Sequence, residues 1–207
     1  MPPKAKFRKE EIIHAALTVA GAKGIDAVTS REVARQLGIS TRPIFTYYDS
    51  MEQLKADVYS LAKERYLEYV ERGLAEPIPF LGVGKQFIRF AKEEPELYKL
   101  LFLTNHGGIS GGAMEAFRFA QNMARESLMR IYHMDAETAD KYFRDLWVVG
   151  FGFATLAVTD DCPYTDEEMN AVMMEISLSV CKAYKEIPGL PEGRVDRDAI
   201  FRELVSK

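Results

Sequence analysis

The sequence predicts an all-α protein with two parts, an N-terminal three-helix unit and a C-terminal helical bundle. Apolar residues recur at three- and four-residue spacing along most of the chain, and capping residues, glycines and prolines bound these segments. No stretch shows the alternation of a half-buried strand. The 207 residues suffice for a sizeable core, and the composition, 47% hydrophobic and 28% charged, is that of an ordinary globular protein.

The first helix is expected from about Lys9 to Lys23, and the next begins after Thr29. The apolar face of the first helix comprises Ile12, Ile13, Ala16, Val19 and Ala20. Thr29 and Glu32 have the spacing of a capping box, in which each side chain pairs with a free backbone N–H. This second helix is expected to end at Gly38, because glycine readily adopts a left-handed conformation.

A third short helix and a long one follow. Ser40 is expected to cap the third helix, with Pro43 in its first turn, where the missing N–H costs nothing. Ser50 and Gln53 form a second capping-box pattern, which begins a helix reaching about Leu74. Two helices joined by a tight glycine turn are the helix-turn-helix arrangement, which presents its second helix to the major groove of DNA.

That docking predicts which side chains meet the DNA. Thr41, Arg42, Pro43 and Thr46 are expected on the exposed face of the third helix, whereas Ile44, Phe45 and Tyr48 are expected to turn partly inward. Arg42 suits a bidentate contact to guanine, and Pro43 offers an apolar surface to a thymine methyl group.

This region resembles the TetR family of transcriptional regulators over about residues 8–66. The matching residues in the helix-turn-helix are Thr29, Val33, Ala34, Leu37, Gly38, Ile39, Ser40, Ile44, Phe45, Tyr48, Ser50, Glu52 and Leu54. Three positions depart from the family pattern: Phe45 replaces tyrosine, Tyr47 replaces histidine and Met51 replaces lysine. The resemblance implies a base contact for Arg31. The full predicted DNA-contacting set is Thr29, Ser30, Arg31, Ser40, Thr41, Arg42, Pro43, Thr46, Tyr47 and Lys55, where the hydroxyls, helix N-termini and Lys55 are phosphate candidates.

Charge is distributed unevenly along the chain. Residues 1–66 hold 11 Lys and Arg against 8 Asp and Glu, whereas residues 67–207 hold 16 against 23. The basic excess therefore lies with the helix-turn-helix, where phosphate neutralisation needs it. Lys4, Lys6, Arg8 and Lys9 form a basic arm, which is either a solubilising tail or a contact to phosphate or the minor groove.

The remaining chain predicts further helices. They are expected at about 79–93, 95–103, 112–132, 136–158 and 165–184, with a short one at 196–205. We expect a DNA-binding domain at 6–66, an effector-binding and dimerisation domain at 67–188 and a polar tail at 189–207. Residues 146–157 are apolar on every side of their helix, which indicates burial on all faces and a partner subunit.

The resemblance also implies a homodimer and a small hydrophobic effector. The predicted interface, by resemblance a four-helix one, comprises Trp147, Gly150, Phe151, Ala154, Val172, Met173, Ile176 and Val180. The residues expected to line a cavity are Tyr66, Phe87, Phe90, Tyr98, Phe102, Phe117, Met123, Trp147 and Phe151, although the same residues equally suit an ordinary core. The expected function is a repressor that binds a palindromic operator on double-stranded DNA and is released by the effector.

Other functions have less support in the sequence. Three scattered histidines form no Ser- or Cys-His-Asp grouping, and no metal-ligand or cofactor spacing appears, so neither an enzyme nor a bound metal or cofactor is expected. The glycine-rich stretch at 105–112 lacks a P-loop lysine. Two cysteines, no apolar signal segment and a longest apolar run of 13 residues predict a cytoplasmic protein without a membrane span. A helical protein-interaction module without DNA binding remains the alternative.

Overall fold

The computed structural model describes residues 7–104, 112–159 and 162–206. Lys4, Lys6 and the glycine-rich residues 105–111 lie outside this part of the chain. The described residues form helices and no strand, which confirms the all-α prediction. Among them no helix is long and apolar enough to cross a membrane, and no cluster of His, Cys, Asp and Glu could hold a metal ion.

The helices follow the predicted order closely. They are α1 (Lys9–Lys23), η1 (Ile25–Ala27, 3₁₀), α2 (Ser30–Leu37), α3 (Ile44–Tyr47), α4 (Met51–Leu74), α5 (Pro79–Glu93), α6 (Pro95–Tyr98), η2 (Lys99–Leu103, a π-helix), α7 (Gly112–Tyr132), α8 (Ala136–Ala157), α9 (Asp166–Glu186) and α10 (Arg197–Val205). Pro79 and Pro95 occupy the first turns of α5 and α6, as expected from their fixed φ and missing N–H.

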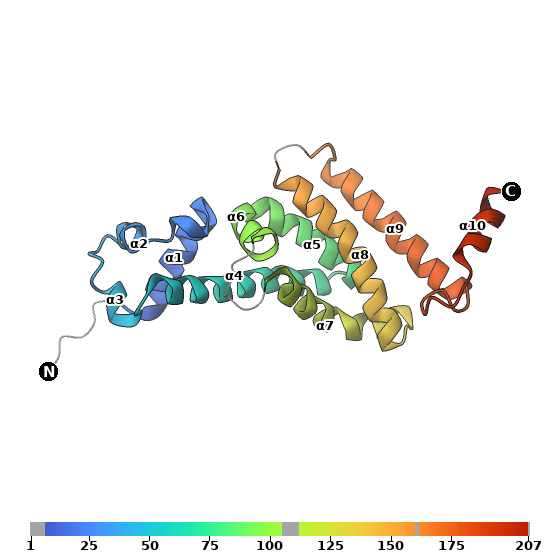
Figure 1. Ribbon diagram of the computed structural model, residues 1–207, viewed down its shortest axis with the longest axis horizontal. Coiled ribbons are helices and arrows are strands. Elements are labelled where there is room, and N and C mark those ends of the chain that lie inside the picture. Colours follow the sequence, from blue (N-terminus) through green and yellow to red (C-terminus); the bar gives the residue numbers. More distant parts are fainter. Residues whose placement is uncertain (1–6, 105–111, 160–161, 207) are drawn as a thin grey trace.

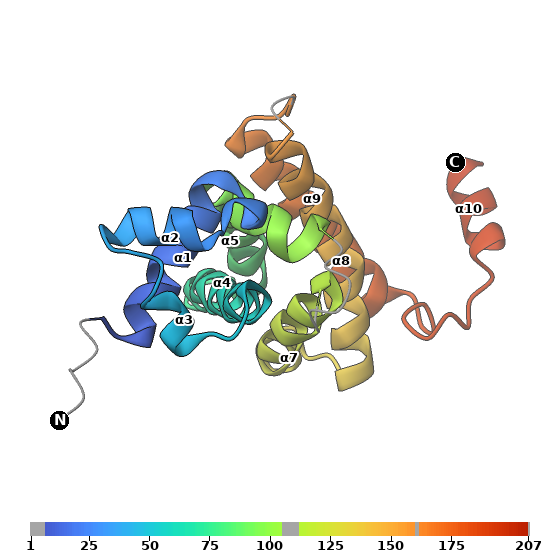
Figure 2. The same cartoon turned by 60° about the vertical axis from the view of Figure 1, so that its left-hand side comes forward.

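The long helix α4 joins the two halves of the molecule. In Figure 1, α1, α2 and α3 gather around its N-terminal end, and the bundle of α5 to α9 lies beyond. Figure 2 shows α4 nearly end-on, with α1 to α3 on its left and α7, α8 and α9 on its right. One continuous cluster of buried apolar side chains runs from Ile12 in α1 to Ala154 in α8, so a movement of α4 is felt in both halves.

Helices α4 and α5 cross with their backbones in contact. A Cβ atom added to Gly82 would lie 2.2 Å from the carbonyl oxygen of Gly73, and one added to Gly73 would lie 2.5 Å from the amide nitrogen of Val83. No side chain fits at either position without separating the helices. The C-terminal end of α4 is therefore fixed to α5, while its N-terminal end carries the helix-turn-helix.

The helix caps follow the predictions only in part. Thr29 and Ser50 accept hydrogen bonds from the amides of Glu32 and Gln53, at 3.2 and 3.3 Å. The second bond of each predicted capping box, from the backbone N–H of the capping residue to the side chain three residues later, is absent from the described chain. The Gln53 side chain accepts from Asp49 N, and the Glu32 carboxylate pairs with Lys23 and Arg35. At the start of α9, Thr165 and Glu168 form a complete capping box.

The last helix has little contact with the rest. Both views show α10 standing away from the bundle beyond the end of α9. None of its described side chains is buried, and Phe201 is 70% exposed. The polar tail predicted from residue 189 thus contains a short helix, at the predicted position.

Candidate functional site

The helix-turn-helix is held together by a small apolar core on its inner side. Val33 and Ala34 of α2, Ile44 of α3 and Tyr48 after it are buried. Gly38 separates the two helices in a left-handed conformation, with φ 65° and ψ 35°, which glycine adopts without strain. The prediction for Phe45 is wrong: its ring is 52% exposed, because Ile44 alone fills the inward position of this short helix.

Helix α3 begins later than predicted. Ser40 forms no cap, and the turn is closed by backbone bonds from Ile44 N to Thr41 O (3.1 Å) and from Thr46 N to Pro43 O (3.2 Å). Both bonds span three residues rather than four. Because Ile44 N bonds to Thr41 O rather than to Ser40 O, the regular helix starts only after Pro43.

The ten predicted DNA-contacting residues all reach the surface. Thr29, Arg31, Ser40, Arg42 and Thr46 are exposed, and Ser30, Thr41, Pro43, Tyr47 and Lys55 are partly exposed. Arg31 and Arg42 take part in no ion pair with the described residues, whereas nearby Arg35 pairs with Glu32 at 2.7 Å. Two free guanidinium groups thus stand near the starts of α2 and α3.

Tyr47 is positioned differently from the other candidates. Its hydroxyl donates a 2.8 Å hydrogen bond to the carbonyl oxygen of Phe7, just before α1. This bond occupies the hydroxyl proton that a phosphate contact would use. It also joins the start of the N-terminal arm to α3.

Tyr48 connects the end of α3 to α4 and α1. Its buried hydroxyl donates to Asp57 Oδ2 at 2.9 Å, and Lys9 Nζ lies 2.9 Å from the same oxygen and 5.0 Å from the centre of the Tyr48 ring. Burial and the carboxylate raise the pKa of Tyr48, so the hydroxyl remains a neutral donor. The position of α3 therefore depends on that of α4.

Glu32 connects α2 to α1. Its carboxylate binds Arg35 on its own helix and Lys23 at the end of α1. These two cations, Arg35 first, lower the pKa of Glu32 to about 2, so the carboxylate stays ionised through the neutral range. The missing half of the capping box is explained by this pairing.

The bundle contains an apolar cavity between four helices. Tyr66 of α4 lines it, with one face of α5, one face of α8 and a single side chain of α9. The lining is Tyr66, Phe80, Val83, Gly84, Phe87, Phe143, Leu146, Trp147, Gly150 and Met173. The space open to a water-sized molecule is only about 20 Å³, so the lining side chains nearly fill the cavity.

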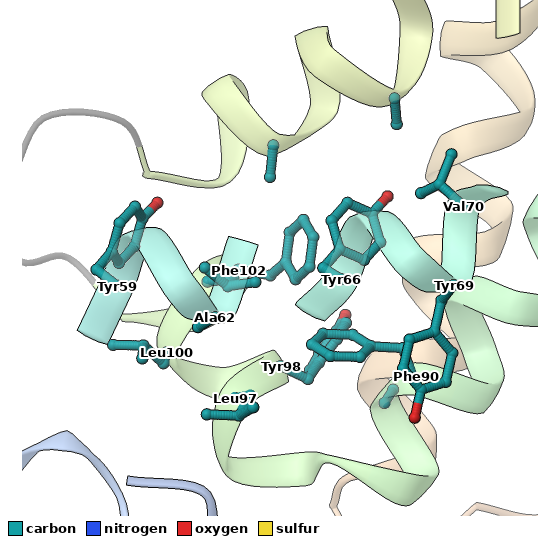
Figure 3. Close-up of a cluster of buried hydrophobic side chains, with 14 of the residues drawn as sticks. Tyr59, Ala62, Tyr66, Tyr69, Val70, Phe90, Leu97, Tyr98, Leu100 and Phe102 are labelled. Atoms are coloured by element: carbon teal, nitrogen blue, oxygen red, sulfur yellow. The ribbon is translucent and has the colours of Figure 1, made fainter. Parts of the chain in front are cut away.

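The structure brings together only part of the predicted ligand set. Tyr66, Phe87 and Trp147 line the cavity. Phe90 and Phe102 instead pack against the Tyr66 ring, and Tyr98 packs against Phe102 (Figure 3). Phe117 and Phe151 contact the far sides of Trp147, and Met123 packs against the core. The other seven lining residues are not in the predicted ligand set: Phe80, Val83, Gly84, Phe143, Leu146, Gly150 and Met173.

Most residues predicted for the dimer interface point into the subunit. Gly150, Ala154 and Met173 are buried, and Trp147 and Phe151 stack on each other at 4.9 Å between ring centres. Val172, Ile176 and Val180 are partly buried against the cores. The large apolar side chains that α8 and α9 expose are others: Val148, Leu156, Met174 and Leu178.

Two protein-family models match this chain, one over the helix-turn-helix and one over the helical bundle. Residues 12–58 match the model of bacterial regulatory proteins of the tetR family, and residues 80–176 match that of a tetracyclin repressor-like C-terminal domain. An uncharacterized HTH-type transcriptional regulator of Mycobacterium tuberculosis is 25% identical over 158 residues, covering 75% of this chain and 72% of that protein.

Two solved structures share the fold. A transcriptional regulator from Rhodococcus sp. Rha1 superposes with a TM-score of 0.59 at 14% identity, covering 86% of this chain and 98% of that one. A TetR family member from Streptomyces coelicolor A3 has a TM-score of 0.58 at 20% identity, with 84% and 98% covered.

Proposed function

Because the chain belongs to the TetR family of transcriptional regulators, whose members bind DNA and are not enzymes, we propose that it is a repressor released from its operator by a small hydrophobic ligand. The observation that carries the DNA-binding part is the pair of free, exposed guanidinium groups of Arg31 and Arg42. Arg31 lies on α2 and Arg42 lies in the turn just before α3, and the inner faces of both helices are buried. A regulator of this kind acts on genomic DNA, so we place it in the bacterial cytoplasm.

In this proposal each residue of the helix-turn-helix has a role. Arg42 and Arg31 contact base edges, with Pro43 and the exposed ring of Phe45 against thymine methyl groups. Thr29, Ser30, Ser40, Thr41, Thr46 and Lys55 contact phosphates or sugars. We assign Tyr47 to holding the N-terminal arm rather than to phosphate, because its proton already binds the Phe7 carbonyl.

The protein acts as a dimer in this proposal, because one short reading helix contacts too few base pairs for specificity in a genome. Val148, Gly152 and Leu156 recur every four residues on the outer side of α8, and Met174 and Leu178 lie on the exposed side of α9. A Cβ atom added to Gly152 would meet nothing within 4 Å, so this strip is open to a close-packed partner. Two copies joined here bind an inverted repeat with half-sites about 34–36 Å, or a multiple of this, apart.

We attribute ligand release to α4, which connects the cavity to the helix-turn-helix. Tyr66, near the middle of α4, forms a wall of the cavity, and Asp57, two and a half turns earlier, holds Tyr48 beside α3. The cavity has room for little more than a water-sized group, so a larger ligand must push its walls apart. Because α4 and α5 are fixed at Gly73 and Gly82, we expect the N-terminal end of α4 to move and the two heads to leave register.

The proposal is tested by DNA binding. Operator fragments are selected from the organism's genomic DNA, and fluorescence anisotropy then measures their affinity for the wild type and for Arg42→Glu at several salt concentrations. We expect an inverted repeat, a steep loss of affinity with salt and no specific binding by Arg42→Glu, with its dimerisation and thermal unfolding unchanged. Equal affinity of the two proteins for DNA, or a flat salt dependence, would favour an interaction module instead.

A further inference from the structure

The hydroxyl group of Tyr66 differs from those of three other buried tyrosines, Tyr69, Tyr98 and Tyr142. Tyr69 donates to Glu93, Tyr98 pairs with Thr155 and Tyr142 pairs with Ser177, at 2.7–2.9 Å. Tyr66 is 1% exposed, yet its hydroxyl has no hydrogen bond within the described chain. The rings of Phe90 and Phe102 pack against the Tyr66 ring (Figure 3), and burial raises the pKa of Tyr66, so it remains an uncharged donor.

A second unpaired donor lines the same cavity. The indole nitrogen of Trp147 is buried and has no hydrogen-bond partner among the described residues. Apart from Tyr66 and Trp147, the lining residues are Phe, Leu, Val, Met and Gly, with no charged group. The cavity therefore combines two neutral N–H and O–H donors with apolar walls.

Such groups indicate where a polar atom of a ligand binds. A buried donor left unpaired destabilises the folded protein, so most proteins pair every one. Here Tyr66 and Trp147 line one cavity, and its remaining space of about 20 Å³ accommodates an atom of the size of a water oxygen. An oxygen with two lone pairs suits a site with two donors.

We propose that the effector is an uncharged, largely apolar compound whose carbonyl oxygen accepts hydrogen bonds from Tyr66 and Trp147. This inference rests on the proposed function, in which the cavity is the effector site. A carboxylate is excluded by the lack of any cation in the lining, because its charge would be buried unpaired. An alcohol would bring a proton of its own for which the lining has no free acceptor except the Tyr66 oxygen.

The test uses two probes of equal shape, cyclohexanone and methylenecyclohexane, in which a methylene group replaces the carbonyl oxygen. Trp147 is the only tryptophan of the chain, so 5-fluorotryptophan labelling yields a single ¹⁹F resonance at the cavity. Titration of this resonance measures the affinity of both probes for the full-length wild type, Tyr66→Phe and Tyr69→Phe. Tyr69 is the matched control, because it lies three residues along α4 and its hydroxyl is already paired.

We expect the wild type and Tyr69→Phe to bind cyclohexanone about five-fold more tightly than methylenecyclohexane. Tyr66→Phe should lose most of this preference and bind methylenecyclohexane as the wild type does. Equal binding of both probes by the wild type, or an unchanged preference in Tyr66→Phe, overturns the carbonyl assignment but leaves the cavity as the effector site. If neither probe shifts the resonance, the cavity is not a ligand site, and both this inference and ligand release through it fail.

Discussion

Replacing Gly82 by alanine tests the fixed crossing of α4 and α5. The new Cβ would lie 2.2 Å from the Gly73 carbonyl oxygen, against about 3.5 Å for an ordinary contact. The helices must therefore separate by more than about 1 Å. Overpacking of this kind costs about 3 kcal/mol at the upper end of its usual range, and alanine returns about 1 kcal/mol in helix propensity. We expect the free energy of unfolding to fall by about 2 kcal/mol.

Urea unfolding at a fixed protomer concentration measures this change. With a slope of about 3 kcal/mol per molar, the midpoint should fall by about 0.7 M. Gly84→Ala is the control, because its Cβ would meet only the terminal methyl of Met173, at 2.8 Å, and that flexible side chain can move. A Gly82→Ala protein whose urea midpoint equals or exceeds that of the wild type would show that the two backbones do not touch there. The C-terminal end of α4 would then not be fixed to α5.

Three further predictions concern the reading head and the subunit contact. Arg42→Ala should weaken operator binding by about 1–3 kcal/mol in anisotropy titrations, mostly at one base position, whereas an equal loss on every sequence would reduce Arg42 to a phosphate contact. Val148→Asp should give a monomer in light scattering, and an intact dimer would place the interface elsewhere. Since the pKa of Glu32 is lowered to about 2, its pairing with Lys23 and Arg35 stabilises the fold above about pH 4.5 and is lost as the pH falls toward 2. The difference in urea midpoint between wild type and Glu32→Gln should vanish over that interval, and a constant difference would contradict the pairing.

The helices were predictable because their ends carry local chemical signals. Thr29, Ser50, Pro79 and Pro95 act on the nearest turn alone, so their positions in the sequence suffice. The predictions failed where two partners compete for one group. Glu32 can close a capping box or bind Lys23, nine residues away, and only the three-dimensional packing of α1 against α2 decides between them.

The cavity lining was harder to predict, although a signal for it exists. Phe80, Val83, Gly84 and Phe87 recur at three- and four-residue spacing and share one face of α5. Phe143, Trp147 and Gly150 do the same on α8. The predicted set consists mainly of aromatic residues from several helix faces, and Phe90 and Phe151 lie on faces that do not meet the cavity. Which face meets a cavity rather than a well-packed neighbour depends on how helices cross, which the periodicity of one helix does not contain.

Helix α8 shows why the sequence alone does not place the subunit contact. Its second half is apolar all round, so its sequence cannot distinguish an inner face from an outer one. In the structure Trp147, Gly150 and Ala154 point into the subunit, and Val148 (61% exposed) and Leu156 (37% exposed) lie nearly opposite. The same helix thus forms a cavity wall on one side and the proposed subunit contact on the other. In the proposed function, a ligand that moves α8 would therefore act on the contact between the two copies as well as on α4, and this is a second proposed route from the cavity to the spacing of the reading heads.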